Sequence, residues 1–121
     1  MFQTGAATLR PIVSRVRRID DGVTLDLIVP ADLAFFDGHF PSAPILPGVV
    51  QVAWAHALAI EHIDAGTDLG SVLRVKFKRI VAPGDALALT LRPKPERHGF
   101  DFEYADEKGQ RSLGFIGRIA P

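Results

Sequence analysis

Four histidines are the side chains of this sequence best suited to move a proton near neutral pH: His39, His56, His62 and His98. Only His39 lies in a loop-forming segment, residues 38–48, which carries three prolines and ends where a long apolar stretch begins. Because prolines limit backbone freedom, such a loop can hold a side chain in one geometry, as a general base requires. Composition and spacing leave a second interpretation equally open, in which His39 only closes the loop by hydrogen bonding.

The apolar pattern predicts the elements that must position this loop. Residues 49–64 lack proline and glycine and are apolar nearly all round, which is typical of a helix enclosed by other elements, so we expect one continuous helix over 48–64. Segments 11–19 and 23–30 alternate partly with period two on either side of a turn and predict a hairpin. A short turn of helix is expected at 31–36. Four more strands, arranged as a meander, are expected near 70–81, 85–94, 98–106 and 111–119.

This element order predicts the fold class. One apolar helix among about six strands indicates an α+β fold in which an antiparallel sheet curls around the helix. With 121 residues, the chain is expected to form a single domain over residues 1–121. A sheet this small leaves an edge strand, so we expect pairing with a second copy.

The composition excludes several kinds of partner. Fourteen Lys and Arg balance fourteen Asp and Glu, so no global basic field can hold nucleic acid or an anionic membrane. The N-terminal residues lack the apolar core of a signal peptide, and the most apolar stretch is shorter than the ~20 residues that span a bilayer, so we expect a cytoplasmic protein. Without cysteine, and with His62 and His98 apart from other ligand types, we expect no metal site.

Two blocks of the sequence resemble the 3-hydroxyacyl-acyl carrier protein dehydratases. Residues 38–49, GHFPSAPILPGV, are similar to the GHFPGxPIxPGV signature of that family. Residues 76–85, KFKRIVAPGD, are similar to its FKRPVxPGD stretch. The continuation at 47–55, PGVVQVAWA, looks most like the branch that works in aryl polyene pigment pathways, because a Gln and a Trp occupy the same places there.

The resemblance implies a hot-dog fold, in which a sheet wraps around a long helix and two subunits join their sheets. It also implies dehydration of a 3-hydroxyacyl thioester on acyl carrier protein to the trans-2-enoyl thioester, in fatty acid or aryl polyene-type biosynthesis and without a cofactor. The resemblance further implies that His39 is the base that takes the C2 proton. It implies that the backbone N–H of Gly48 is the donor to the thioester carbonyl, to which the helix that begins there would add a favourable dipole.

The sequence departs from the family at the proton donor. The family's carboxylate lies fourteen residues after the histidine, and that position is Ala53. Alanine cannot protonate the departing hydroxide, and loss of a general acid typically costs about 10²- to 10⁴-fold in rate. His56, on nearly the same helix face, is the best local substitute acid, although a histidine on an apolar helix is more often a core residue hydrogen-bonded to backbone or water.

Further residues are expected to contact the substrate and its carrier. The expected substrate contacts are Phe40, Pro47, Val49, Gln51 and Trp54. Gln51 could bind the hydroxyl or orient a water but cannot act as an acid, and the aromatic residues could equally be ordinary core. A basic strand face made by Arg74, Lys76 and Lys78 suits an acidic carrier protein, although a merely solvated face explains it as well.

Two other functions stay open on the sequence alone. If, as the resemblance implies, each site combines the histidine of one subunit with the carboxylate of the other, the chain could be a non-catalytic subunit that binds acyl carrier and pairs with an acid-bearing partner. It could also be an acyl thioesterase, since other hot-dog proteins hydrolyse acyl thioesters, but the two blocks favour elimination. Acyl length and pathway do not follow from the sequence.

Overall fold

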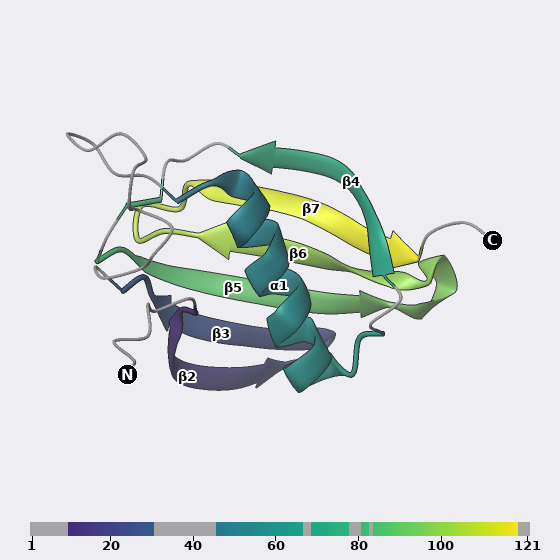
Figure 1. Cartoon of the computed structure of the whole chain (residues 1–121). Helices are drawn as coiled ribbons and strands as arrows, with labels where there is room; N and C mark the ends of the chain where they lie inside the picture. Colours follow the sequence, from purple (N-terminus) through teal and green to yellow (C-terminus); the bar gives the residue numbers. More distant parts are fainter. Residues whose placement is uncertain (1–9, 31–45, 67–68, 78–80, 83, 119–121) are drawn as a thin grey trace, which may run out of the picture.

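A computed structural model describes residues 10–30, 46–66, 69–77, 81–82 and 84–118, with the backbone alone at 69–74 and 118 (Figure 1). Its elements, in chain order, are β2 (Ile12–Ile19), β3 (Gly22–Ile28), α1 (Gly48–Ile63), β4 (Leu69–Phe77), β5 (Ala86–Lys94), the 3₁₀ helix η2 (Pro95–Arg97), β6 (Gly99–Ala105) and β7 (Arg111–Arg118). The short helix expected at 31–36 and most of the loop at 38–48 lie outside the described residues. Each predicted strand has its counterpart among these elements.

The strands form one antiparallel sheet in the order β2-β3-β5-β6-β7-β4, and α1 runs diagonally across one of its faces (Figure 1). The predicted hairpin of β2 and β3 is confirmed. The predicted meander is wrong for its first strand, because only β5, β6 and β7 follow one another, whereas β4 pairs with β7 at the far edge. The free edge of β3 is occupied by β5, so β4 finds its hydrogen-bond partner on the other side of the sheet.

Strand β4 contains an irregularity that changes which residues share a face. Leu73 pairs with Phe115 and Lys76 pairs with Leu113, so β4 carries one more residue than β7 between these two pairs. A bulge of this kind interrupts the period-two alternation of side chains. The alternation from which Arg74 and Lys76 were expected to share a strand face is therefore interrupted in this stretch of backbone.

The inner face of the sheet supplies most of the core. Along β6, Phe100, Phe102 and Tyr104 are buried, and the acidic residues between them are only half-buried. The three aromatic side chains share one face because they alternate along the strand. The same alternation on β3 and β5 buries a row of aliphatic side chains: Val23, Leu25, Leu27, Leu87, Leu89 and Leu91. This face is the one that helix α1 covers.

Helix α1 confirms the predicted continuous helix and ends at Asp64, which takes a left-handed conformation with φ 54°. The sheet covers one helical face, where the buried residues are Val50, Gln51, Trp54, Ala55, Leu58 and Ala59. The opposite face carries Val49, which is 76% exposed, together with exposed Ala53 and Ile60. The expectation that other elements enclose the helix therefore holds for only one face, because the single sheet of this chain lies on one side of it.

A glutamate should distinguish the two helix faces. Ala55→Glu should lower the free energy of unfolding by about 3 kcal/mol or more, because Ala55 is fully buried and the new charge would have no partner. Ala53→Glu is the matched control and should change it little, since Ala53 is exposed. Urea denaturation followed by circular dichroism measures both. Equal losses in the two variants would contradict this assignment of the faces.

Candidate active site

The first turn of helix α1 offers a place for a negative charge. Pro47 is the residue before the helix, with φ −59° and ψ 145°, and no side chain among the described residues caps the helix start. The Pro47 carbonyl accepts hydrogen bonds from the N–H groups of Val50, at 3.1 Å, and Gln51, at 3.3 Å. The N–H groups of Gly48 and Val49 have no acceptor within the helix, since the first N–H groups of any α-helix lack one. Together with the helix dipole they favour an anionic oxygen at this end.

Gly48 is needed for the close packing at this helix end. A Cβ atom on Gly48 would lie 2.8 Å from Cε2 of Phe77, closer than carbon atoms approach. Phe77 ends strand β4, and its side chain is 44% exposed. The aromatic ring thus forms a wall directly beside the Gly48 backbone, and a ligand bound at the Gly48 N–H would lie next to it.

Backbone and side-chain hydrogen bonds hold this helix end in place. The N–H of Leu46 donates to the carbonyl of Val81 at 2.7 Å, and Nε2 of Gln51 donates to the carbonyl of Leu46 at 3.3 Å. The hydroxyl of Tyr104 donates to the backbone carbonyl of Gln51 at 2.6 Å. Gln51 is only 3% exposed, and its Oε1 has no hydrogen-bond partner within the described part of the chain. Gln51 thus carries a buried acceptor that a ligand or a water could occupy.

Residues 76–85, the second block that resembles the family, end in a turn that supports the start of helix α1. Ala82 donates its N–H to Oδ2 of Asp85 at 2.8 Å, and Asp85 returns its own N–H to the carbonyl of Ala82 at 3.2 Å. Gly84, with φ 83°, and Asp85 also exchange backbone hydrogen bonds with Val29, both at 2.8 Å. This turn fixes the chain just after Val81, the residue that holds Leu46. The contribution of Asp85 is therefore structural, one step removed from the helix start.

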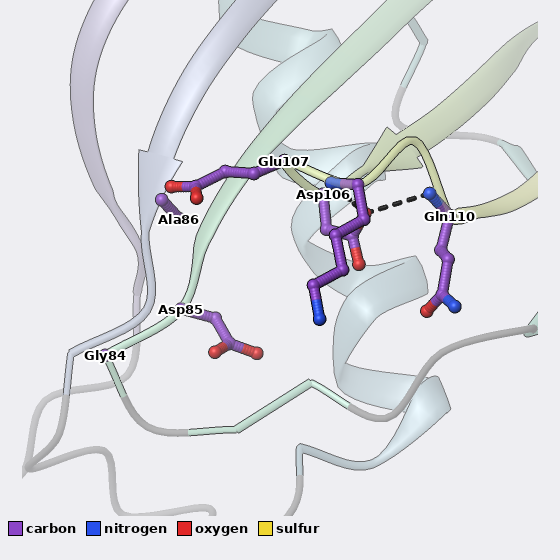
Figure 2. A pocket seen from close by; sticks show the side chains of 7 residues that line it. Gly84, Asp85, Ala86, Asp106, Glu107 and Gln110 are labelled. Carbon is purple, nitrogen blue, oxygen red and sulfur yellow. Dashed lines mark hydrogen bonds between the residues drawn. The ribbon is translucent and has the colours of Figure 1, made fainter.

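A hollow of about 360 Å³ lies between this turn and the turn that joins β6 to β7 (Figure 2). Asp85, Asp106 and Glu107 are among the residues that line it. One carboxylate oxygen of Asp106 accepts the N–H groups of Lys108 and Gln110, each at 2.9 Å, so this side chain stabilises its own turn as Asp85 does. The hollow is acidic because two turns meet there, and we do not assign the reaction to it.

The structure places some of the predicted site residues and leaves others out. His39, Phe40 and Lys78 lie outside the described residues, and Arg74 is described in its backbone only. Of the expected substrate contacts, Val49 is exposed beside Gly48, whereas Trp54 is 5% exposed and belongs to the core.

The predicted substitute acid is held by a structural contact. Nε2 of His56 lies 2.9 Å from the carbonyl oxygen of Gly66, to which it donates. The imidazole ring also lies 6.2 Å from the ring of Phe100, centroid to centroid. These contacts account for a half-buried histidine on this helix without a role in proton transfer.

A second hollow, of about 560 Å³, lies between β6, β7 and β4. Asp101 and Glu103 line it along with three basic residues, two of which the sequence pattern did not reveal. Lys76 lines it together with Arg92 and Arg97. The guanidinium of Arg97 lies 4.2 Å from the centroid of the Phe115 ring, a favourable cation–π distance. Arg97 was missed because it lies in η2, between β5 and β6, so the alternation within residues 70–81 gives no sign of it.

Neither a membrane-spanning helix nor a metal site is found among the described residues. No helix there is long and apolar enough to cross a bilayer. No group of three or more His, Asp or Glu side chains in the same residues is arranged to hold a metal ion.

The comparisons with known proteins agree with this geometry. Residues 15–114 match the family model of the ApeI dehydratases. The 3-hydroxyacyl-[acyl-carrier-protein] dehydratase FabZ of Oenococcus oeni is 47% identical over 64 residues, which cover 47% of this chain and 46% of that protein. FabZ of Chloroflexus aggregans is 33% identical over 97 residues, which cover 73% of this chain and 67% of that protein. The chain thus spans less than half of the first relative and about two thirds of the second.

A solved structure matches most of the chain. It is that of the dehydratase heterocomplex ApeI:P from Xenorhabdus doucetiae; the match has a TM-score of 0.81 and 29% identity and covers 89% of this chain and 96% of that one. A protein from Erwinia carotovora subsp. atroseptica, described only as uncharacterized, matches with a TM-score of 0.75 and 30% identity, over 89% of this chain and 93% of that one. The expected hot-dog fold is confirmed, and so is the resemblance to the 3-hydroxyacyl-acyl carrier protein dehydratases. Within them, this chain belongs to the ApeI-like dehydratase family, the aryl polyene branch that the residues after Gly48 indicated.

The turn at Asp85 can be tested by removing its acceptor. Asp85→Ala should lower the free energy of unfolding by about 1–3 kcal/mol, because the part-buried N–H of Ala82 loses its carboxylate partner. Asp85→Asn keeps an oxygen acceptor and should lose less. Glu107→Ala, which truncates an exposed carboxylate at the same hollow, should lose almost nothing. Urea denaturation of the three variants would show similar losses if the turn hydrogen bond were unimportant.

The ionisation of Tyr104 offers a spectroscopic check on the buried end of the site. Burial raises the pKa of this phenol well above its ordinary value of 10.0, and Tyr104 is the only tyrosine of the chain. A raised folded-state pKa means that the neutral phenol stabilises the fold below about pH 10 and that this stability is lost as the pH rises further. Absorbance at 295 nm should therefore show no tyrosinate until the chain unfolds. Titration near pH 10 in the folded protein would contradict the burial of the hydroxyl.

Proposed function

We propose that this chain carries half of a dehydratase active site, which removes water from a 3-hydroxyacyl thioester borne by acyl carrier protein. The observation that carries the proposal is the family match over residues 15–114, which include His39, Gly48 and Ala53. The packing at Gly48 supports it, since hydrogen bonds hold the helix start in place and its first N–H groups have no acceptor within the helix. The names of the relatives give the substrate class, a 3-hydroxyacyl group on a carrier protein.

In the proposed reaction, His39 and Gly48, which lie near the two ends of residues 38–49, each have one role. His39 takes the proton from C2 of the substrate, which leaves an enolate on the thioester, and the electron pair of the enolate then forms the double bond between C2 and C3 as the C3–O bond breaks. Charge that develops on the thioester oxygen is met by the N–H of Gly48 and the positive end of α1. The loss of one such donor typically costs about 10²- to 10³-fold in turnover. The departing hydroxide must also receive a proton and leave as water.

That last proton cannot come from Ala53, so we infer that a partner subunit supplies it. Ala53 lies on the helix face that the chain's own sheet leaves exposed, between Val49 and Ile60. A second copy of this chain, the pairing expected from the exposed sheet edge, would again present an alanine there. A related hot-dog subunit with Asp or Glu at this position would complete the site formed with His39. The similar ApeI:P structure is that of a heterocomplex, which supports a pairing of this kind.

His56 is the alternative proton source within the chain. Its Nε2–H is already donated to the Gly66 carbonyl, and transfer to the substrate would require that hydrogen bond to break. We therefore prefer the acid-bearing partner, and His56 enters the experiment below as a variant.

The remaining contacts belong to substrate and carrier. We propose that Val49 and Pro47 border the thioester with Phe40. Oε1 of Gln51, which has no hydrogen-bond partner among the described residues, accepts a hydrogen bond from the 3-hydroxyl or from a water beside it. The buried position of Trp54 is that of a core residue at the base of the site. The proposed carrier surface combines Lys76 with Arg92 and Arg97 around the second hollow, and it includes Arg74 and Lys78 as the sequence predicts. Asp101 and Glu103 line the same hollow, and Arg92 pairs with Asp21 at 3.1 Å.

The missing acid is tested by restoring it. The wild-type chain alone should convert a 3-hydroxyacyl carrier substrate slowly or not at all, and Ala53→Asp should raise the rate by about 10²-fold or more, because a proton donor then stands where the family places one. His39→Ala in the Ala53→Asp background should abolish the gain. Absorbance of the conjugated enoyl thioester measures turnover, and thermal unfolding checks that each variant is folded.

Two results would overturn parts of this proposal. An active wild type that His56→Ala inactivates would assign the proton to His56 and remove the need for a partner. If wild type and Ala53→Asp were both inert, also when mixed with an acid-bearing hot-dog subunit, the dehydratase function would be wrong and a purely structural subunit would replace it.

A further inference from the structure

Tyr104 is a buried polar residue in an otherwise apolar contact between sheet and helix. It lies on β6, is 2% exposed, and its ring meets the ring of Phe102 edge-on with centroids 6.1 Å apart. Its hydroxyl donates to the backbone carbonyl of Gln51 at 2.6 Å. At the other end of α1, Arg18 on β2 donates to the carbonyl of His62 at 3.0 Å. The sheet therefore holds the helix by a directional hydrogen bond at each end.

The hydrogen bond of Tyr104 acts on the turn that begins at Gly48. Gln51 follows Gly48 by three residues, so its carbonyl and the Gly48 N–H belong to the same turn of helix. Apolar packing is not directional and lets a helix shift along its axis at little cost, whereas a short hydrogen bond fixes distance and direction. A displacement of about 1 Å at a catalytic group can cost as much as 10²-fold in rate.

We propose that Tyr104 is a positioning residue that sets the Gly48 N–H against the thioester carbonyl through the first turn of α1. The inference rests on the proposed function, because it concerns the oxyanion donor of that reaction. Tyr104 itself does not touch the substrate: its hydroxyl is fully engaged under the helix. Burial raises the pKa of the phenol, so the hydroxyl remains a donor at every pH at which the protein is folded.

A purely structural role is the alternative, and it predicts a different set of results. The loss of any buried hydrogen bond lowers stability, by about 1–3 kcal/mol, wherever the bond lies. The Thr24 and Thr90 hydroxyls form such a bond, at 3.0 Å, between β3 and β5. Thr24 alternates with the inward-facing Val23 and Leu25, so this pair lies on the sheet face away from the helix. Thr24→Val therefore removes a part-buried hydroxyl without touching α1.

The experiment compares Tyr104→Phe with Thr24→Val in the Ala53→Asp background. Tyr104→Phe keeps the ring and removes only the hydroxyl, and it should lower kcat about tenfold to a hundredfold with KM within about twofold. Thr24→Val should leave both constants unchanged at a temperature at which both variants are folded. Equal kcat values for Tyr104→Phe and its parent would overturn the proposal, and so would an equal loss in both variants.

A second readout does not depend on turnover. Butyryl-pantetheine, which lacks the 3-hydroxyl and cannot be dehydrated, is prepared with ¹³C at the thioester carbonyl and bound to each protein. A hydrogen bond from Gly48 should shift the carbonyl ¹³C resonance downfield in wild type and Thr24→Val, and the shift should shrink in Tyr104→Phe. An undiminished shift in Tyr104→Phe would overturn the positioning role alone. If the carbonyl resonance did not shift in any of the three proteins, both the positioning role of Tyr104 and the assignment of Gly48 as the donor would be overturned.

Discussion

The structure depends on how the apolar helix is fixed at its first turn. Apolar side chains on one sheet face hold α1 in place against the core, but they do not determine where along its axis it begins. Three hydrogen bonds make that choice: Leu46 to Val81, the Gln51 side chain to Leu46, and Tyr104 to the Gln51 backbone. Gly48 lies within this set, and the Phe77 ring packed against it leaves no room for a side chain. The N–H groups of Gly48 and Val49 are thereby fixed at the positive end of the helix, although the apolar packing of the core does not itself set a direction.

The same helix also bears on the proposal that one chain holds only half of the site. A single sheet buries the face with Trp54 and Leu58 and leaves the face with Val49 and Ala53 exposed. An apolar helix with one uncovered face is typical of a subunit whose second covering comes from another chain. Under the proposed function, the family's acid would stand on that face at the position of Ala53, where this chain has only a methyl group. A partner that covers this helix face and supplies a carboxylate would bury the exposed apolar side chains and protonate the departing hydroxide through the same contact.

The elements were predictable from the sequence where local pattern decides them. The hairpin followed from period-two alternation about a turn, and the helix followed from a long apolar run that ends at Asp64. The position of β4 was not predictable, because strand order is decided by which edges are free after β5 has paired with β3. A bulge in β4, which leaves no mark in the spacing, likewise broke the alternation assumed for Arg74 and Lys76. Gly48 is proposed as a site residue from the motif resemblance. Tyr104 had no signal in the sequence, because the alternation of a strand does not distinguish a hydroxyl that holds a helix from an ordinary aromatic core residue.

The central claim, that this chain holds the base and the oxyanion donor but not the acid, is tested most directly by the half-reaction that needs no acid. Removal of the C2 proton from butyryl-pantetheine, followed by its return from solvent, uses only His39 and the Gly48 N–H. In D₂O, the wild-type chain alone should incorporate deuterium at C2, detected by mass spectrometry, and His39→Ala should not. If the folded wild-type chain exchanged no C2 proton with bound substrate, the chain would not contain this half-site and the account would be wrong.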